Sequence, residues 1–207
     1  MRSTEIMKAQ RKRRFGQARG FSLVELLIVT AVMIVVLGLI GSLMITTQRQ
    51  YMSQQALIDA SNNARVGLDL MLRLARVAGN NPNPEDFSFE PIHPDPDGNS
   101  QMDSIRLLAD WNPGDGDTDD AYEDMIFSTS NGVLWIQRPS DDEPVEFVDR
   151  VESLTFSYKD SDGADISSSD AVANRDSIAY VDIELRTSVP DVPAMLFKSS
   201  AVIRSRK

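Results

Sequence analysis

The longest apolar run of the chain lies near its N-terminus. Residues 26–47 form 22 consecutive positions without a charged side chain, and about 20 such residues span the hydrocarbon of a membrane as a helix. Glu25 is the acid immediately before this run. An ionisable group at the edge of a membrane helix is costly and usually has a partner. The pattern predicts a transmembrane helix with a functional carboxylate at its start.

Beyond residue 47 the small and apolar positions recur at every third or fourth residue. They are Leu57, Ser61, Ala64, Leu68, Met71 or Leu72, Ala75 and Ala78. Such a stripe is typical of a helix that packs one face on a core. Residues 21–78 contain no proline, and Gly79-Asn80-Asn81-Pro82 is a strong stop signal. One continuous helix is therefore predicted, transmembrane over 21–47 and amphipathic over 48–79.

The remaining residues, 80–207, predict a globular head. Five prolines in residues 81–99 argue against regular structure there, and we expect His93 within that segment to be an exposed loop residue. Strand patterns follow at 104–109, 125–130, 133–138, 151–159, 179–186 and 195–203. Asn131-Gly132 predicts a hairpin between two of them, with Trp135 expected in the core. A long helix followed by hairpin-linked strands predicts an α+β fold with a mostly antiparallel sheet.

Charge is distributed unevenly along the chain. The whole chain carries a net charge of −10, but residues 1–20 hold seven basic side chains and one acid, so the rest carries −16. Basic residues beside a membrane span stay in the cytoplasm, which places the acidic head outside. Such a head would repel nucleic-acid phosphates. The chain has no Cys and a single His, which removes thiol nucleophiles and most imidazole-dependent catalytic pairs, so we expect no enzyme.

The junction before the apolar run carries a specific motif, Gly20-Phe21-Ser22-Leu23-Val24-Glu25-Leu26-Leu27. It resembles the class III signal of type IV prepilins and pseudopilins in every position. The resemblance implies that prepilin peptidase removes the basic leader, residues 1–20, by cutting between Gly20 and Phe21, and that the new Phe21 amine is methylated. It further implies that Glu25 pairs with the Phe21 amine of a neighbouring subunit in a filament. A plain membrane anchor would explain neither the Gly-Phe junction nor Glu25.

A looser likeness extends past this signal. Residues 67–80 and the Val-x-x-Leu-x-Phe-x-Tyr segment at 151–158 resemble PilW-type minor pilins. That resemblance implies a pilin-like fold and an inner-membrane, single-pass protein with a periplasmic head, which then enters a pilus and helps to initiate its assembly. The implied partners are other pilins, prepilin peptidase and the inner-membrane assembly platform, and no nucleic acid. Pseudopilin J of type II secretion remains the main alternative, and a DNA-binding competence pilin is disfavoured by the acidic head.

One loop concentrates carboxylates. Residues 110–124, here called the acidic loop, hold seven Asp and Glu side chains. Such loops supply oxygen ligands to Ca²⁺, and the spacing is similar to calcium loops of extracellular proteins, with one residue inserted. The candidate ligands are Asp110, Asn112, Asp115, Asp117 and Asp119. A solvated acidic loop without metal is the alternative. Shorter Asp-x-Asp-Gly sets that begin at Asp95 and Asp160 are expected to be plain turns.

Overall fold

The structure is a computed structural model that describes residues 20–85, 87–111, 114–138, 143–190 and 192–203. The chain divides into two compact units, the first ending at Gln48 and the second beginning at Arg49. Helix α1 (Leu23–Val77) contributes to both. It begins and ends within two residues of the predicted limits. Gly79, with a φ of 79°, follows its end in the left-handed conformation that terminates helices.

The part of α1 in the first unit is apolar and entirely exposed. Residues 21–50 all have exposed side chains, so no core among the described residues covers this segment. Among the described residues, α1 is the one helix long and apolar enough to cross a membrane. A helix that is apolar on all sides is stable only when it is buried in protein or lipid. The structure is thus that of a protein with a membrane-capable N-terminal helix.

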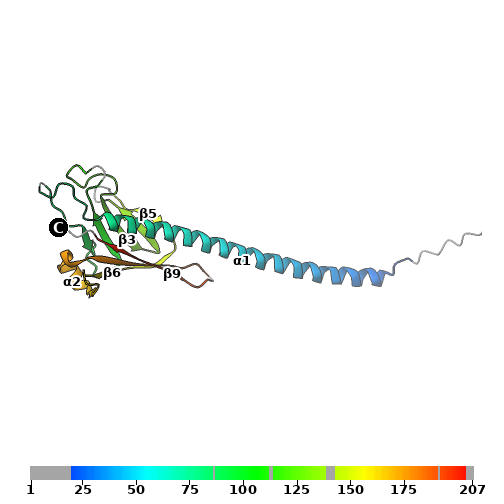
Figure 1. Cartoon of the computed structure of the whole chain (residues 1–207). Helices are drawn as coiled ribbons and strands as arrows, with labels where there is room; N and C mark the ends of the chain where they lie inside the picture. The colour runs from blue at the N-terminus through cyan, green and yellow to red at the C-terminus, as the bar shows by residue number, and fades with distance from the viewer. Residues whose placement is uncertain (1–19, 86, 112–113, 139–142, 191, 204–207) are drawn as a thin grey trace, which may run out of the picture. The chain divides into compact units, whose positions relative to one another are not determined.

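Five antiparallel strands form the first sheet of the second unit, in the order β1-β2-β3-β4-β5. Figure 1 labels β3 and β5 of this sheet. They are β1 (Ile92–Pro94), β2 (Ser104–Leu108), β3 (Asp124–Ser130), β4 (Val133–Gln137) and β5 (Val145–Val148). The β3–β4 turn has positive φ at both central residues, 52° at Asn131 and 78° at Gly132. This is the geometry that Asn-Gly favours in two-residue hairpins. The predicted hairpin is confirmed.

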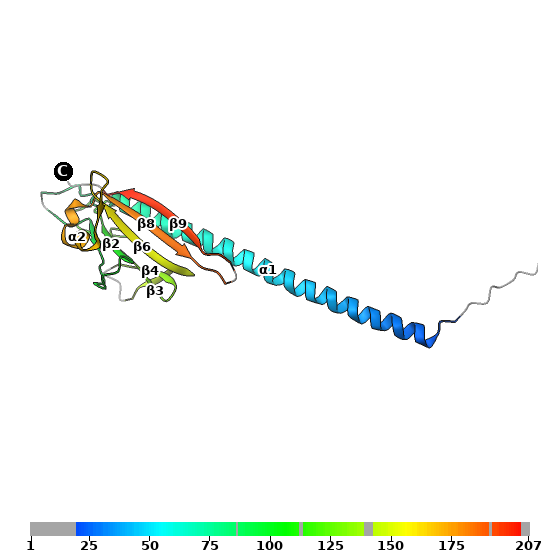
Figure 2. The ribbon, with the colours of Figure 1, turned by 90° about the horizontal axis from the view of Figure 1, so that it is seen from below.

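The second sheet has four antiparallel strands in the order β7-β6-β8-β9, and Figure 2 shows β6, β8 and β9 side by side. The strands are β6 (Val151–Lys159), β7 (Asp165–Ile166), β8 (Tyr180–Thr187) and β9 (Met195–Val202). Helix α2 (Ser168–Ala173) and the 3₁₀ helix η1 (Arg175–Ser177) connect β7 to β8. A register shift between Val151 and Ser153 explains why the buried Val151 and Leu154 are three residues apart.

The second half of α1 packs on the core between these sheets. Its buried residues are Ala60, Ala64, Gly67, Leu68, Met71, Leu72, Leu74 and Ala75. All of these except Ala60 and Gly67 belong to one apolar cluster with Phe127 of the first sheet and Phe156 of the second. The helix approaches the first sheet closely, because a Cβ added to Gly67 would lie 3.0 Å from Cγ2 of Val148 and 3.2 Å from Cδ2 of Leu134. An α+β fold with antiparallel sheets is therefore observed.

Two expectations about the head are wrong. His93 lies on β1 with its side chain partly buried, within the proline-rich segment that was expected to lack regular structure. Trp135 is half-buried, and its neighbour Leu134 is the core residue. Successive strand residues point to opposite faces, so burial of Leu134 turns Trp135 outward, where its Nε1 donates to the Ser130 carbonyl at 3.2 Å.

Candidate functional site

Gly20 and Phe21 lie just before α1, and both are exposed. Glu25 lies in the first turn of the helix. Its backbone N–H donates to the Ser22 carbonyl at 3.0 Å, and this bond helps to close the first turn. Residues 1–19 of the leader lie outside the described residues. The junction and the carboxylate are therefore at the accessible start of the apolar helix.

Glu25 has no basic partner among the side chains that the structure describes. Anions are favoured near the N-terminus of a helix, where the backbone N–H groups point outward. That interaction is small compared with the cost of placing a carboxylate at the edge of a membrane. A cation from another molecule would offset this cost. The arrangement is chemically suited to an intermolecular ion pair.

The acidic loop connects β2 to β3, and two buried carboxylates stand at its base. Asp110 and Glu123 are both 0% exposed. The strand pairing continues to this point, since the Ala109 N–H donates to the Glu123 carbonyl at 2.8 Å. Glu123 Oε1 then accepts the N–H of Trp111 at 2.8 Å. Both carboxylates thus enter the same buried corner, from opposite ends of the loop.

Two hydrogen bonds with Asn80 hold the backbone of Asp110, one at its N–H and one at its carbonyl. Its N–H donates to the Asn80 carbonyl at 2.8 Å, and its carbonyl accepts from Nδ2 of Asn80 at 2.7 Å. Its side-chain Oδ2 accepts the N–H of Gly116 at 3.0 Å across the loop. Its Oδ1 is buried and accepts no hydrogen bond from the residues that the structure describes. Asn80, which follows the end of α1, therefore fixes the backbone of Asp110. The carboxylate of Asp110 keeps one oxygen that no described residue bonds.

The other candidate ligands behave differently. Asp115, Asp117 and Asp119 are exposed, and Asn112 lies outside the described residues. The Asp119 N–H donates to Oδ1 of Asp117 at 3.1 Å. A hydrogen bond to Asp117 and repulsion from Asp117, Asp120 and Asp115 raise the pKa of Asp119. Over the described part of the chain, no three carboxylate or imidazole groups converge on one metal position.

The candidate Ca²⁺ ligands predicted from the sequence did not include Glu123. The predicted strands at 104–109 and 125–130 are joined by the loop, so pairing them places Ala109 opposite Glu123. That pairing was the available signal. The two shorter acidic sets fold as expected: Asp160 Oδ1 accepts the N–H groups of Asp162 and Ala164, and Asp95 accepts those of Asn99 and Ser100. Both are turns closed by a carboxylate.

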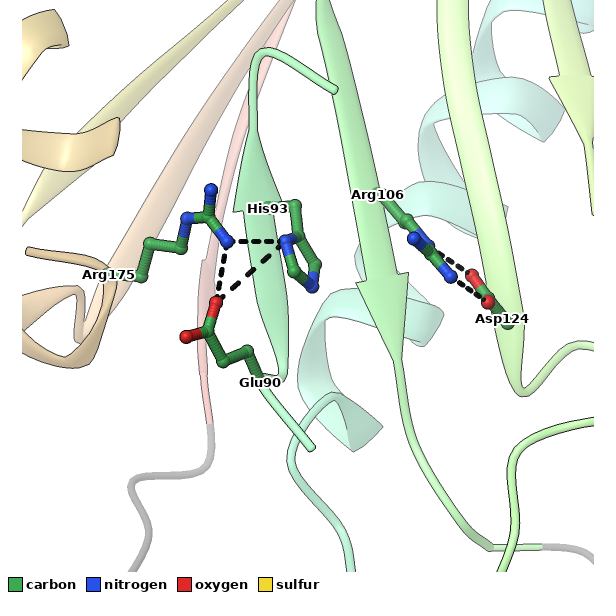
Figure 3. A network of polar contacts seen from close by, with 5 residues as sticks. All are labelled: Glu90, His93, Arg106, Asp124 and Arg175. Atoms are coloured by element: carbon green, nitrogen blue, oxygen red, sulfur yellow. Dashed lines mark hydrogen bonds and ion pairs between the residues drawn. The ribbon is translucent and has the colours of Figure 1, made fainter. Parts of the chain in front are cut away.

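A second polar cluster connects the two sheets (Figure 3). A guanidinium nitrogen of Arg175, in η1, lies 2.6 Å from Oε2 of Glu90 and 2.6 Å from Nδ1 of His93 on β1. Arginine is always protonated and cannot accept a hydrogen bond. It therefore donates to His93, and this contact requires the neutral imidazole. The cluster fastens the α2–η1 connection to the edge strand of the first sheet.

The charges around His93 agree with that assignment. Partial burial and the nearby guanidinium groups of Arg175 and Arg106 lower the pKa of His93, against smaller opposite effects of Glu90 and Asp124. Arg106 is itself neutralised by a two-point pair with Asp124 across β2 and β3, at 2.8 and 2.5 Å. Hydrogen bonding to Asp124 raises the pKa of Arg106. His93 is neutral at neutral pH in this setting.

This lowered pKa predicts a pH dependence of stability. The unfolded chain binds a proton at His93 near the ordinary pKa of 6.5, whereas the folded chain binds it only at lower pH. The free energy of unfolding should therefore fall as pH decreases below about 6.5. His93→Gln cannot titrate but keeps an acceptor for Arg175, so its melting temperature should decrease less between about pH 7 and pH 5. Equal decreases in the two proteins would contradict this role.

Comparisons with known proteins add no assignment. No protein-family model matches the chain, and no curated protein matches it. Any functional inference therefore depends on the residues and geometry described above.

Proposed function

We propose that this chain is a minor type IV pilin of the PilW type, which takes part in initiating and assembling a pilus. The observation that carries the proposal is the complete motif Gly20-Phe21-Ser22-Leu23-Val24-Glu25, placed directly at the start of an exposed, membrane-length helix. An antiparallel head packed on the second half of that helix is consistent with a pilin-like fold.

The proposed mechanism is assembly, not catalysis. Prepilin peptidase removes the leader between Gly20 and Phe21 and methylates the new amine. Before insertion into the filament, the single-pass protein is anchored in the inner membrane with its head in the periplasm. During insertion, Glu25 pairs with the Phe21 amine of a neighbouring pilin, and the apolar part of α1 packs among the helices of other subunits. A Cβ added to Gly38 or Gly41 would meet no atom of the described residues within 4 Å outside the adjoining helix backbone, which leaves both positions open to such packing.

The test is a clean deletion, scored in parallel for surface pili and for the profile of secreted proteins. Lost pili with normal secretion are expected. Normal pili with a lost set of secreted enzymes would overturn the proposal in favour of pseudopilin J. No change in either property would also count against it. A gel-shift assay with DNA at moderate salt addresses the competence alternative, and we expect no binding because residues 21–207, which remain after the leader is removed, carry a net charge of −16.

A further inference from the structure

The buried base of the acidic loop has an unusual electrostatic composition. Asp110 and Glu123 place two carboxylates, each 0% exposed, at the same corner of the head. Burying an ionised carboxylate costs several kcal/mol or more unless charge and hydrogen bonds compensate. Within the described residues, no Lys, Arg or His forms an ion pair with Asp110. Residues 110–124 contain no basic residue at all.

One oxygen of the Asp110 carboxylate indicates which kind of ligand would fit this corner. Oδ2 of Asp110 accepts the Gly116 N–H, whereas Oδ1 is buried and has no hydrogen-bond donor within the described part of the chain. A cation satisfies this oxygen directly. The burial of Oδ1 is evidence that does not depend on the number of acids in the loop, because water can solvate the exposed acids.

The rest of the loop carries further oxygen ligands. The Gly116 N–H donates to the Asp110 carboxylate, so a hydrogen bond ties the segment that holds Asp115 and Asp117 to Asp110. Gly116 has a φ of 97°, a conformation that favours glycine and that lets the chain turn sharply at this point. Mutual repulsion among the exposed acids is relieved when a cation is bound.

We propose that the acidic loop binds one Ca²⁺ ion at its base through Asp110 and Glu123, and that Asp115, Asp117 and Asp119 close over the ion. Ca²⁺ suits this set because it takes roughly six to eight oxygen ligands in flexible geometry, including backbone carbonyls. Mg²⁺ demands a near-ideal octahedron and gives up its water reluctantly. Asp110 and Glu123 are already in place, and the exposed acids are drawn in when the ion binds. Ca²⁺ therefore orders the loop and stabilises the head.

The experiment uses the full-length chain in detergent, stripped with a chelator and titrated with Ca²⁺ or Mg²⁺ by calorimetry and by thermal unfolding. Ca²⁺ is expected to bind once per chain and to raise the melting temperature, with a much smaller response to Mg²⁺. Asp110→Asn and Asp117→Asn should each weaken Ca²⁺ affinity by tenfold or more. Asp162→Asn is the matched control, since it removes one carboxylate from another exposed acidic turn and should leave affinity unchanged.

Two results would overturn the site. One is the absence of heat and of a thermal shift when the stripped wild-type chain meets millimolar Ca²⁺. The other is an affinity that falls equally in Asp117→Asn and Asp162→Asn, which would mean diffuse attraction to an acidic surface. If Asp110→Asn does not fold, Asp117→Asn decides the question, because its side chain is exposed and its loss should not disturb the core. The outcome is independent of whether the chain assembles into a pilus.

Discussion

Glu25→Ala is expected to abolish incorporation of this chain into a filament while leaving cleavage after Gly20 intact. The carboxylate lies in the first turn of α1, is exposed, and has no basic partner among the described residues. In a filament core of low dielectric, its pairing with a neighbour's Phe21 amine would supply both attraction and register. Removing it leaves that amine uncompensated. In the proposed mechanism the peptidase acts earlier, at the exposed Gly20–Phe21 junction, and does not need this pair.

The measurement is the amount of the chain in sheared filaments, relative to the processed form in the membrane, for wild type and variant. We expect at least a tenfold decrease with Glu25→Ala. Glu152→Ala is the matched control, because it removes an exposed carboxylate from β6 in the head, and its incorporation should remain normal. Normal incorporation of Glu25→Ala would contradict the register role, and unprocessed precursor would show instead that the variant disturbs the peptidase site.

Gly67→Leu is expected to lower the free energy of unfolding of the head by about 2 kcal/mol. A Cβ at this position would already lie 3.0 Å from Val148 and 3.2 Å from Leu134, both in the core. Overpacking of this kind costs about 1–3 kcal/mol. Better helix propensity than glycine returns less than about 1 kcal/mol. The helix must therefore shift away from β4 and β5, and the core loosens on both sides.

Gly67→Ala separates the cost of overpacking from the gain in helix propensity. Its single methyl group requires the neighbouring side chains to move by a few tenths of an ångström, and the gain in helix propensity of about 1 kcal/mol offsets that cost. Its stability should be near that of wild type. Val66→Leu, an exposed change one residue earlier, is the control for the substitution itself and should stay within about 0.5 kcal/mol. Denaturant unfolding measures all three, and wild-type stability of Gly67→Leu would show that the helix does not press on this sheet.

Local pattern was sufficient for most elements of the fold. The helix, the Asn131-Gly132 hairpin and the alternating strand β8 follow from periodicity and turn chemistry within a few residues, so they were predictable. Strands β1, β5 and β7 were missed because they are short and have no clear alternation of their own. Each is a strand only because a neighbour offers hydrogen bonds, as when β1 pairs His93 with Arg106 of β2. Edge strands also tolerate the prolines that argued against β1.

The candidate sites also differ in whether local sequence or tertiary packing forms them. The processing junction and Glu25 are contiguous in sequence, and their meaning depends on order and spacing along one helix, which the chain itself specifies. The contact of Arg175 with His93 joins residues 82 positions apart, and the buried pair Asp110 and Glu123 exists only because β2 and β3 bring the two ends of a loop together. Burial and proximity across the sheets come from packing, and packing free energy depends on the whole core. No local pattern encodes those contacts, and so they required the folded head.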